Sequence, residues 1–275
     1  MDPLLVVVVT AGTACVFALL ASILTRDYSW VDRSWSIVPI VYAVELAGSA
    51  RLRDPRLDVM AIVIAIWGAR LTFNFARKGG YSGVEDYRWA VLRARMPRWQ
   101  FQIFNVCFIV LYQNFILVAI VLPLWTAYQH RSHSYGIVDV ILAVLFLACT
   151  AGETVADQQQ WDFQSWKAAE IAAGRTPQPQ FLQEGLFRYS RHPAYFFEVA
   201  QWWVIFLMGC SAAGSLRQWS VIGAVLLTLL FIGSTRFTES ITISRYPEYS
   251  RYQQRTSAII PWLPRRPEPI TSTVD

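Results

Sequence analysis

Long runs of apolar residues, separated by polar stretches, dominate the pattern along this chain. Each run approaches the roughly 20 residues that an α-helix needs to cross a bilayer core about 30 Å thick. The second, fifth and seventh runs are near the lower length limit, so one of them could instead be interfacial or re-entrant. The pattern predicts an all-α polytopic membrane protein with about seven transmembrane helices. The seven runs cover residues 3–24, 34–50, 57–75, 101–125, 136–152, 194–216 and 219–235.

The composition agrees with this class and excludes an ordinary soluble protein. Of the 275 residues, 55% are hydrophobic and 16% are charged, whereas about a quarter of residues are charged in soluble domains. The aromatic fraction of 15% is high enough to supply belts at the membrane interfaces. All four cysteines lie inside apolar runs, so no disulfide framework or metal site is implied. We therefore expect a single membrane domain over residues 1–275.

The positive charges are distributed unequally between the two sides of such a bundle. With seven spans, the connections on the side of the C-terminus carry 18 lysines and arginines, against 5 on the opposite side. The positive-inside rule then predicts an outside N-terminus and a cytoplasmic C-terminus. The net charge of +5 follows from this topology, and we expect no nucleic acid partner. The two largest connections, 76–100 and 153–193, would be cytoplasmic, so a soluble cofactor should enter from that side.

Arg70 is unusual because it lies near the end of the third run. Trp67, Asn74 and Arg77 follow the helical spacing and share its face. An arginine at depth is costly to insert, so this face should look into the bundle, where Arg70 could bind a ligand. A structural ion pair and a side chain that snorkels to the interface are the alternatives.

Other polar residues within the spans indicate a wet or ligand-filled interior. Gln113 has a simpler explanation in an interhelical hydrogen bond, as does its neighbour Asn114. Asp32, at the start of the second run, could cap the helix, pair with Arg33 or donate a proton. The spacing alone favours the cap. The remaining two are Glu45 and Glu198.

The predicted cytoplasmic side carries three groups of polar and aromatic residues. Arginines suit phosphates and tyrosine rings can stack on a flat heterocycle, which indicates a nucleotide-like cofactor. A solvated helix end, lipid headgroup contacts and an interfacial anchor are the corresponding alternatives. The groups are the stripe of Glu153, Asp157 and Gln160, the segment 185–198 with Arg188, Arg191, His192, Tyr195 and Glu198, and the residues Arg236, Glu239, Tyr249 and Tyr252.

The order of these elements carries a resemblance to a known family. The residues concerned are Asp32 and Trp35, Arg70, Leu71 and Arg77, the segment 85–88, Gln113, Glu153 and Asp157, Arg191-His192-Pro193-x-Tyr195-x-x-Glu198, and Tyr246-Pro247-x-Tyr249 through Pro261. In residue type and spacing, the chain resembles the bacterial, largely uncharacterised membrane branch of the steroid 5-alpha-reductase (3-oxo-5-alpha-steroid 4-dehydrogenase) superfamily. The resemblance covers residues 32–261 and implies a seven-helix fold in a bacterial inner membrane. It also implies NADPH-dependent reduction of a carbon-carbon double bond conjugated to a ketone in a steroid-like or other lipid.

The resemblance also implies a division of labour along the chain. The helices of about 1–135 would serve the substrate, residues 136–262 would bind NADPH, and 263–275 would form a tail. Asp32 corresponds to the acid that acts on the substrate carbonyl, and Glu45 is a second candidate. The residues expected on the substrate side are Trp35, Trp67 and Gln113. Trp67 stands where the reductases have a tyrosine. The expected NADPH-binding residues are Arg70, Glu153, Asp157, Gln160, Arg191, His192, Tyr195, Glu198, Arg236, Glu239, Tyr249 and Tyr252.

The chain differs from the family's usual residues at two positions of the segment 191–198, and two alternative functions remain open. Ala194 and Phe197 stand where asparagine and glycine are usual. Membrane methyltransferases that use S-adenosylmethionine on isoprenylcysteine or phospholipids share an Arg-His-Pro-x-Tyr segment and a later acidic residue, here Glu239. A non-catalytic lipid-binding protein is the other alternative. Because bidentate guanidinium contacts suit phosphates, we expect Arg191 to bind NADPH, and Arg191→Ala to weaken that binding about tenfold.

Overall fold

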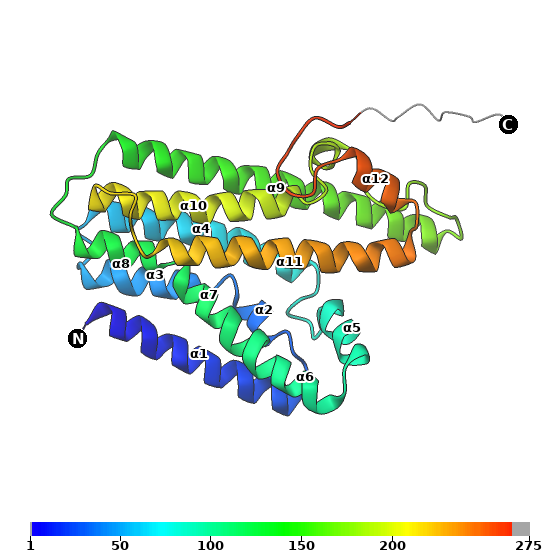
Figure 1. Cartoon of the computed structure of the whole chain (residues 1–275), viewed down its shortest axis with the longest axis horizontal. Helices are drawn as coiled ribbons and strands as arrows, with labels where there is room; N and C mark the ends of the chain where they lie inside the picture. Colours follow the sequence, from blue (N-terminus) through cyan, green and yellow to red (C-terminus); the bar gives the residue numbers. More distant parts are fainter. Residues whose placement is uncertain (1, 266–275) are drawn as a thin grey trace. The chain divides into compact units, whose positions relative to one another are not determined.

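The computed structural model of the chain describes residues 2–265, and within this range the regular structure is helical (Figure 1). Tail residues 266–275 and Met1 lie outside the described part. The predicted all-α membrane bundle is therefore confirmed as the fold class. The helices are α1 (Pro3–Thr25), α2 (Trp30–Ser34), α3 (Val38–Ser49), α4 (Pro55–Arg77), α5 (Tyr87–Arg95), α6 (Arg98–Phe104), α7 (Gln113–Ala119), α8 (Leu122–Gln129), α9 (Ile137–Ala172), α10 (Pro193–Ala213), α11 (Val221–Arg245) and α12 (Tyr249–Arg255), with a π-helical stretch η1 (Asn105–Tyr112) and a 3₁₀ turn η2 (Gly185–Arg188).

Six helical segments in the described part are long and apolar enough to cross a membrane. The second predicted span differs, because the chain turns at 35–37 and α3 begins only at Val38. Its 12 residues rise about 18 Å, well short of a bilayer core. The fifth and seventh predicted runs, in contrast, are parts of longer helices, α9 with 36 residues and α11 with 25. The six segments are Pro3–Thr25, Pro55–Arg77, Arg98–Gln129, Ile137–Ala172, Pro193–Ala213 and Val221–Arg245.

The chain divides into two compact units, to which α9, α10 and α11 each contribute residues. Unit 1 comprises Met1–Thr150 and Val199–Leu229. Unit 2 comprises Ala151–Glu198 and Leu230–Asp275. The functional division into a substrate half and a cofactor half remains a prediction.

Unit 1 is held together by close helix approaches at small residues. At Gly223 of α11 a side chain would overlap the backbone at Ala119 of α7, and at Gly68 of α4 it would overlap Ser36 and Ile40. Small residues at such crossings let the backbones approach, which favours van der Waals packing within a membrane. These glycines therefore fix the spacing of α4 and α11 against their neighbours in unit 1.

A buried ion pair fixes one loop of unit 1. The guanidinium of Arg56 donates to both carboxylate oxygens of Asp139, from Nε at 2.8 Å and from Nη2 at 2.9 Å. It also donates to the carbonyl oxygens of His133 and Ser134. Both charged side chains are only 2% exposed. The pair thus ties the start of α4 to the loop that leads into α9.

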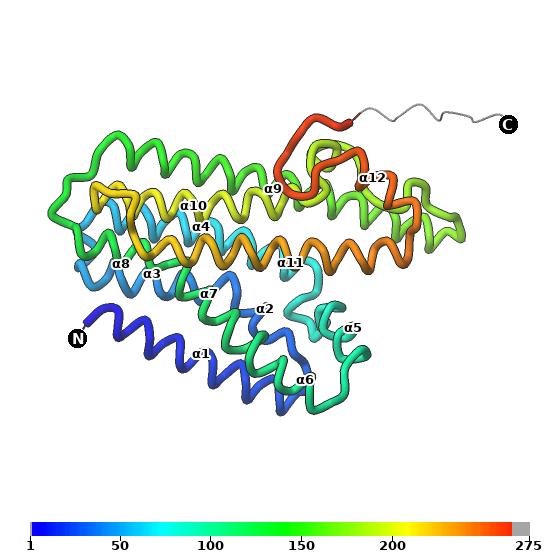
Figure 2. The backbone as a smooth tube through the Cα atoms, viewed as in Figure 1, coloured from blue at the N-terminus to red at the C-terminus, as the bar shows by residue number. Residues whose placement is uncertain are grey.

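Unit 2 folds by pairing two segments that are far apart in the sequence. Ser190 and Ser257 form a parallel bridge, and the backbone N–H groups of Arg191 and His192 donate to the carbonyl oxygens of Ser257 and Ala258. Trp262 donates in turn to the carbonyl oxygen of Tyr189. The chain after α12 therefore runs along the segment that precedes α10 (Figure 2).

Candidate functional site

Glu239 of α11 is the centre of a buried hydrogen-bond network in unit 2. Its carboxylate accepts from Arg191, through Nε at 2.6 Å and Nη2 at 3.0 Å. His192 Nε2 lies 3.0 Å from the same carboxylate, and Gln253 Nε2 donates at 2.7 Å. The hydroxyl of Tyr249 donates at 3.3 Å. Four side chains, two from the residues just before α10 and two from α12, thus converge on the carboxylate of Glu239, a residue that is 7% exposed.

Arg191 is almost fully occupied by this network. Besides Glu239, its Nη1 donates to the carbonyl oxygens of Gln253 and Thr256. Among the residues that the structure describes, four of the five N–H groups of the guanidinium have partners. Burial alone would lower the pKa of Arg191, but the ion pair with Glu239 outweighs it and raises the pKa. The contacts give Arg191 a structural task, so the geometry does not support the expected phosphate contact.

His192 and Tyr195 are positioned by the same contacts. His192 Nε2 faces a carboxylate, which can only accept, so this nitrogen carries the proton. The imidazole stacks on Tyr195 with ring centroids 5.1 Å apart, and Tyr195 meets Phe231 of α11 edge to face at 4.6 Å. The rings therefore line up between the start of α10 and α11 within unit 2.

Two buried tyrosines hold α12 against the rest of unit 2. Tyr252 donates to the carbonyl oxygen of Phe187, and Phe181 packs on both tyrosine rings. Burial raises the pKa of Tyr249 and of Tyr252, and the charge of Glu239 acts in the same direction. Both hydroxyls therefore remain neutral donors over the ordinary pH range.

The predicted stripe on α9 is only partly buried. Glu153 is 4% exposed, whereas Asp157 and Gln160 are partly exposed. The hydrogen bond that organises the next segment comes from Gln159, whose side-chain oxygen accepts from the backbone N–H of Leu186 at 2.9 Å. Gly185 lies against this side chain with a φ of +59°, where a Cβ would overlap Gln159.

The start of α10 shows how the chain accommodates Phe197, which stands where the resemblance leads us to expect glycine. The Phe197 ring occupies the space that a side chain at position 152 would fill. Gly152 and Phe197 thus form a complementary pair, since the glycine leaves room for the large residue. Glu198, the next residue on α10, is 4% exposed. The bulk of Phe197 is therefore absorbed within unit 2.

Asp32 in unit 1 does not cap a helix, which corrects the interpretation that spacing alone favoured. Ser29 precedes α2 and Ile37 precedes α3, whereas the Asp32 carboxylate accepts from the indole Nε1 of Trp89 at 2.7 Å. Burial raises the pKa of Asp32, and the opposing charge of Arg88 does not cancel this effect. A carboxyl with a raised pKa retains its proton more readily, as an acid must.

Arg33 does not pair with Asp32 either. Its Nη2 lies 2.5 Å from Asp27, and its Nε donates to the carbonyl oxygen of Gly80. Asp32 is therefore held by a neutral partner, Trp89, while its neighbour in sequence ties the loop before α2 to the segment after α4.

The other predicted residues of unit 1 are dispersed. Trp67 is fully buried and packs edge to face on Trp202, with centroids 4.9 Å apart. Trp35 packs against the aromatic cluster around Tyr28. Gln113 is 4% exposed and Arg70 is partly exposed. Arg70 belongs to unit 1, unlike the other predicted cofactor-binding residues.

Two side-chain hydrogen bonds involve polar residues that the sequence analysis placed within or at the end of the spans. Arg77 Nε donates to Asn74 Oδ1 at 2.9 Å, so these residues share a face of α4 as predicted. Glu45 Oε1 accepts from the hydroxyl of Thr10 in α1 at 2.6 Å.

Sequence reasoning missed several residues that the structure brings into these networks. Trp89, Gln159 and Gln253 have uncharged side chains, and their partners lie far away in sequence or on another element. No periodicity or local spacing signals such contacts. The position of Trp89 directly after the segment 85–88 was the only available hint.

Fold and site together define a polytopic helical membrane protein with a buried polar network that includes Arg191 and His192 at the start of α10. The chain belongs to the family described as "Protein of unknown function (DUF1295)", whose match covers residues 18–256. This family is a member of the steroid 5-alpha-reductase-like superfamily. The chain is also similar to "Uncharacterized protein C594.04c" of the fission yeast Schizosaccharomyces pombe, with 34% identity over 88% of this chain and 75% of that protein. No solved structure matches the chain. Because this relative is eukaryotic, family membership does not imply a bacterial source.

Proposed function

We propose that the protein is an NADPH-dependent reductase that saturates a carbon-carbon double bond conjugated to a ketone in a membrane lipid. The observation that carries the proposal is the arrangement of arginines in unit 2. Arg191 is buried in an ion pair with Glu239. In contrast, three other arginines of unit 2 are exposed, namely Arg188 on η2, Arg236 on α11 and Arg255 on α12. Exposed guanidinium groups are suited to the phosphates of a dinucleotide.

The residues of unit 2 fit such a cofactor in their chemistry. The Glu239 network fixes the start of α10 and α12 against α11, and Tyr252 ties η2 to α12, so the arginines that these elements carry are presented from a rigid frame. Arg236 lies three residues before Glu239, almost one turn along the same helix. Arg236 and Arg188 therefore replace Arg191 as the proposed phosphate ligands.

NADPH would supply the hydride for the β carbon of the enone. Asp32 would donate a hydrogen bond or a proton to the carbonyl oxygen as negative charge develops there. Its raised pKa favours the protonated form that this role needs, and Trp89 fixes the orientation of the carboxyl. The proposed substrate is apolar and reaches the protein through the lipid bilayer, because the helices that flank Asp32 are apolar.

The methyltransferase alternative needs Glu239 as an available acid. Four side chains already occupy that carboxylate, including the positive charge of Arg191. S-adenosylmethionine carries a positive sulfonium, a single carboxylate and no phosphate, so several exposed arginines suit the phosphates of NADPH better. The structure thus provides more support for the phosphate-bearing cofactor, and the transferase becomes an outcome of the test.

Isothermal titration of the purified protein in mild detergent, with NADPH and with S-adenosylmethionine, tests the class of cofactor. We expect NADPH to bind, and Arg236→Ala and Arg188→Ala each to weaken binding about tenfold or more. The loss should shrink as salt screens the wild-type contact. Arg217→Ala is the matched control, since Arg217 is an exposed arginine of unit 1.

Activity is measured separately by mass spectrometry, as the gain of two hydrogen atoms on enone lipids. Binding of S-adenosylmethionine without NADPH would make the reductase proposal wrong. Binding of neither would favour the non-catalytic lipid-binding alternative.

A further inference from the structure

Two buried polar atoms on α3 lack a hydrogen-bond partner within the described residues. They are the hydroxyl of Tyr42, whose residue is 0% exposed, and Oε2 of Glu45. The two residues are three positions apart on the same helix and therefore share a face. Buried polar groups are almost always satisfied, and an unsatisfied hydroxyl or carboxylate oxygen costs stability unless a ligand or water completes it. This face of α3 is therefore incomplete as it stands.

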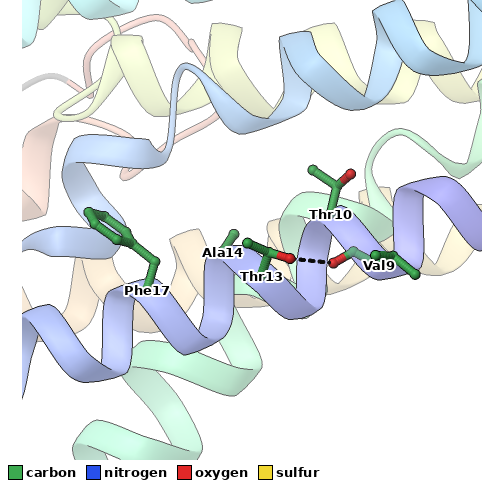
Figure 3. A pocket seen from close by; sticks show the side chains of 5 residues that line it. All are labelled: Val9, Thr10, Thr13, Ala14 and Phe17. Atoms are coloured by element: carbon green, nitrogen blue, oxygen red, sulfur yellow. Dashed lines mark hydrogen bonds between the residues drawn. The ribbon is translucent and has the colours of Figure 1, made fainter.

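The incomplete face is connected to a groove on α1. The other carboxylate oxygen of Glu45 accepts from Thr10, and Thr10 also lines the groove (Figure 3). The remaining lining residues are Val9, Thr13, Ala14 and Phe17. The groove measures about 400 Å³, within the range typical of small-molecule sites. One hydrogen bond thus separates the wall of an open groove from an unsatisfied carboxylate oxygen.

The lining of the groove shows what kind of body a ligand would have. Val9 and Phe17 are more than half exposed, on a helix that is long and apolar enough to cross a membrane. In a bilayer these side chains meet lipid, so a ligand can arrive laterally and the acyl chains can cover its outer side. The hydroxyl of Thr13 is already satisfied by the carbonyl oxygen of Val9 at 3.0 Å, as the dashed line in Figure 3 shows. The groove therefore suits an apolar molecule.

The two unsatisfied atoms restrict the polar group of that molecule. A carboxylate oxygen only accepts, whereas the tyrosine hydroxyl can donate as well as accept. A single alcohol group complements both, because it can donate to Glu45 and accept from Tyr42. A ketone has no proton to donate to Glu45, and an ammonium group cannot accept from Tyr42.

We propose that α1 and α3 form a binding site for a lipid alcohol, with the alcohol group held between Glu45 and Tyr42 and the apolar body along the groove of Val9, Ala14 and Phe17. This site is independent of the proposed reductase activity. In this proposal Glu45 binds a ligand, whereas the sequence suggested it as the second candidate for the acid that acts on the substrate carbonyl.

Photolabelling in nanodiscs tests the site with a defined probe, a diazirine analogue of cholesterol. Peptide mapping should place the label on α1 in the wild-type protein. Excess unlabelled cholesterol should compete, whereas cholesterol methyl ether, which has no proton to donate, should compete at least fivefold less well. This comparison uses the wild-type chain and does not depend on the folding of any variant.

Variants then assign the polar contacts. Tyr42→Phe removes only the hydroxyl and should reduce labelling of α1 about fivefold, and Glu45→Leu should reduce it tenfold or more. Tyr128→Phe is the matched control, because it removes a tyrosine hydroxyl from α8 in the same unit but outside the groove, and its labelling should equal that of the wild type. Melting temperatures of all variants show whether each is folded.

Several results would overturn the proposal. They are the absence of label on α1, equal competition by the alcohol and its methyl ether, or wild-type labelling in folded Tyr42→Phe and Glu45→Leu proteins.

Discussion

Replacing Arg191 distinguishes a structural role from a phosphate-binding role. Arg191→Ala removes two hydrogen bonds to Glu239 and two to the carbonyl oxygens of Gln253 and Thr256. It also leaves Glu239 as a buried carboxylate with only His192 and neutral partners around it. The end of α12, with Gln253 and Thr256, would therefore lose its main attachment to the residues that precede α10.

The magnitude follows from the burial of both partners. The side chains of Arg191 and Glu239 are 9% and 8% exposed, and removing one partner of such a buried pair typically costs 3–5 kcal/mol. At about 2–4 °C per kcal/mol for a chain of this size, the melting temperature should fall by about 6–20 °C. Arg191→Lys keeps the charge but loses the two-pronged contact, so its loss should be smaller.

A double variant isolates the cause. Removing both charges in Arg191→Met with Glu239→Leu should recover part of the stability lost by Arg191→Ala, because no uncompensated charge remains. Tryptophan fluorescence during heating in detergent measures the melting temperature, and NADPH titration well below it measures binding. Our reasoning is refuted if Arg191→Ala melts like the wild type while NADPH binding falls in a salt-sensitive manner. That outcome would restore Arg191 as a phosphate ligand.

Three further predictions concern other parts of the chain. The folded-state pKa of Asp32 is raised, so the protein loses stability as pH rises through the unfolded pKa of about 3.9. Asp32→Asn should therefore have a higher melting temperature than the wild type at neutral pH, and this difference should vanish below about pH 3. The same variant should lose turnover. Equal melting at all pH values would contradict the assigned shift. Gly223→Ala should destabilise the protein by about 1–3 kcal/mol, because its methyl group would overlap the backbone of α7. Gly233→Ala on the same helix has open space around it and should be neutral or slightly stabilising. Similar melting curves for both variants would argue against this helix crossing. Reporter fusions at the two ends should place the C-terminus in the cytoplasm. The six long helices put the N-terminus on that same side, whereas the outside N-terminus expected from seven spans would require α3 to complete a crossing.

The sequence by itself determined that this is an all-helical membrane protein, and the physical reason is local. A chain that crosses lipid must satisfy its backbone hydrogen bonds within each segment, so apolar run length alone identifies the helices. The same reading located the charged and aromatic residues around positions 191, 239 and 249. It did not show that the second apolar run is interrupted at 35–37, because the turn replaces only a few helical residues and leaves the hydropathy unchanged.

Tertiary structure decided what the charged side chains do. An arginine in a sequence can equally bind a phosphate, a lipid headgroup or a carboxylate, and the choice depends on which group the fold brings within about 3 Å. For Arg191 that group is Glu239, 48 residues further along the chain. For Asp32 it is the indole of Trp89, on a helix that its own spacing could not anticipate. Hydrogen bonds and burial act over a few ångströms, whereas sequence patterns report only a residue's neighbours along its own helix.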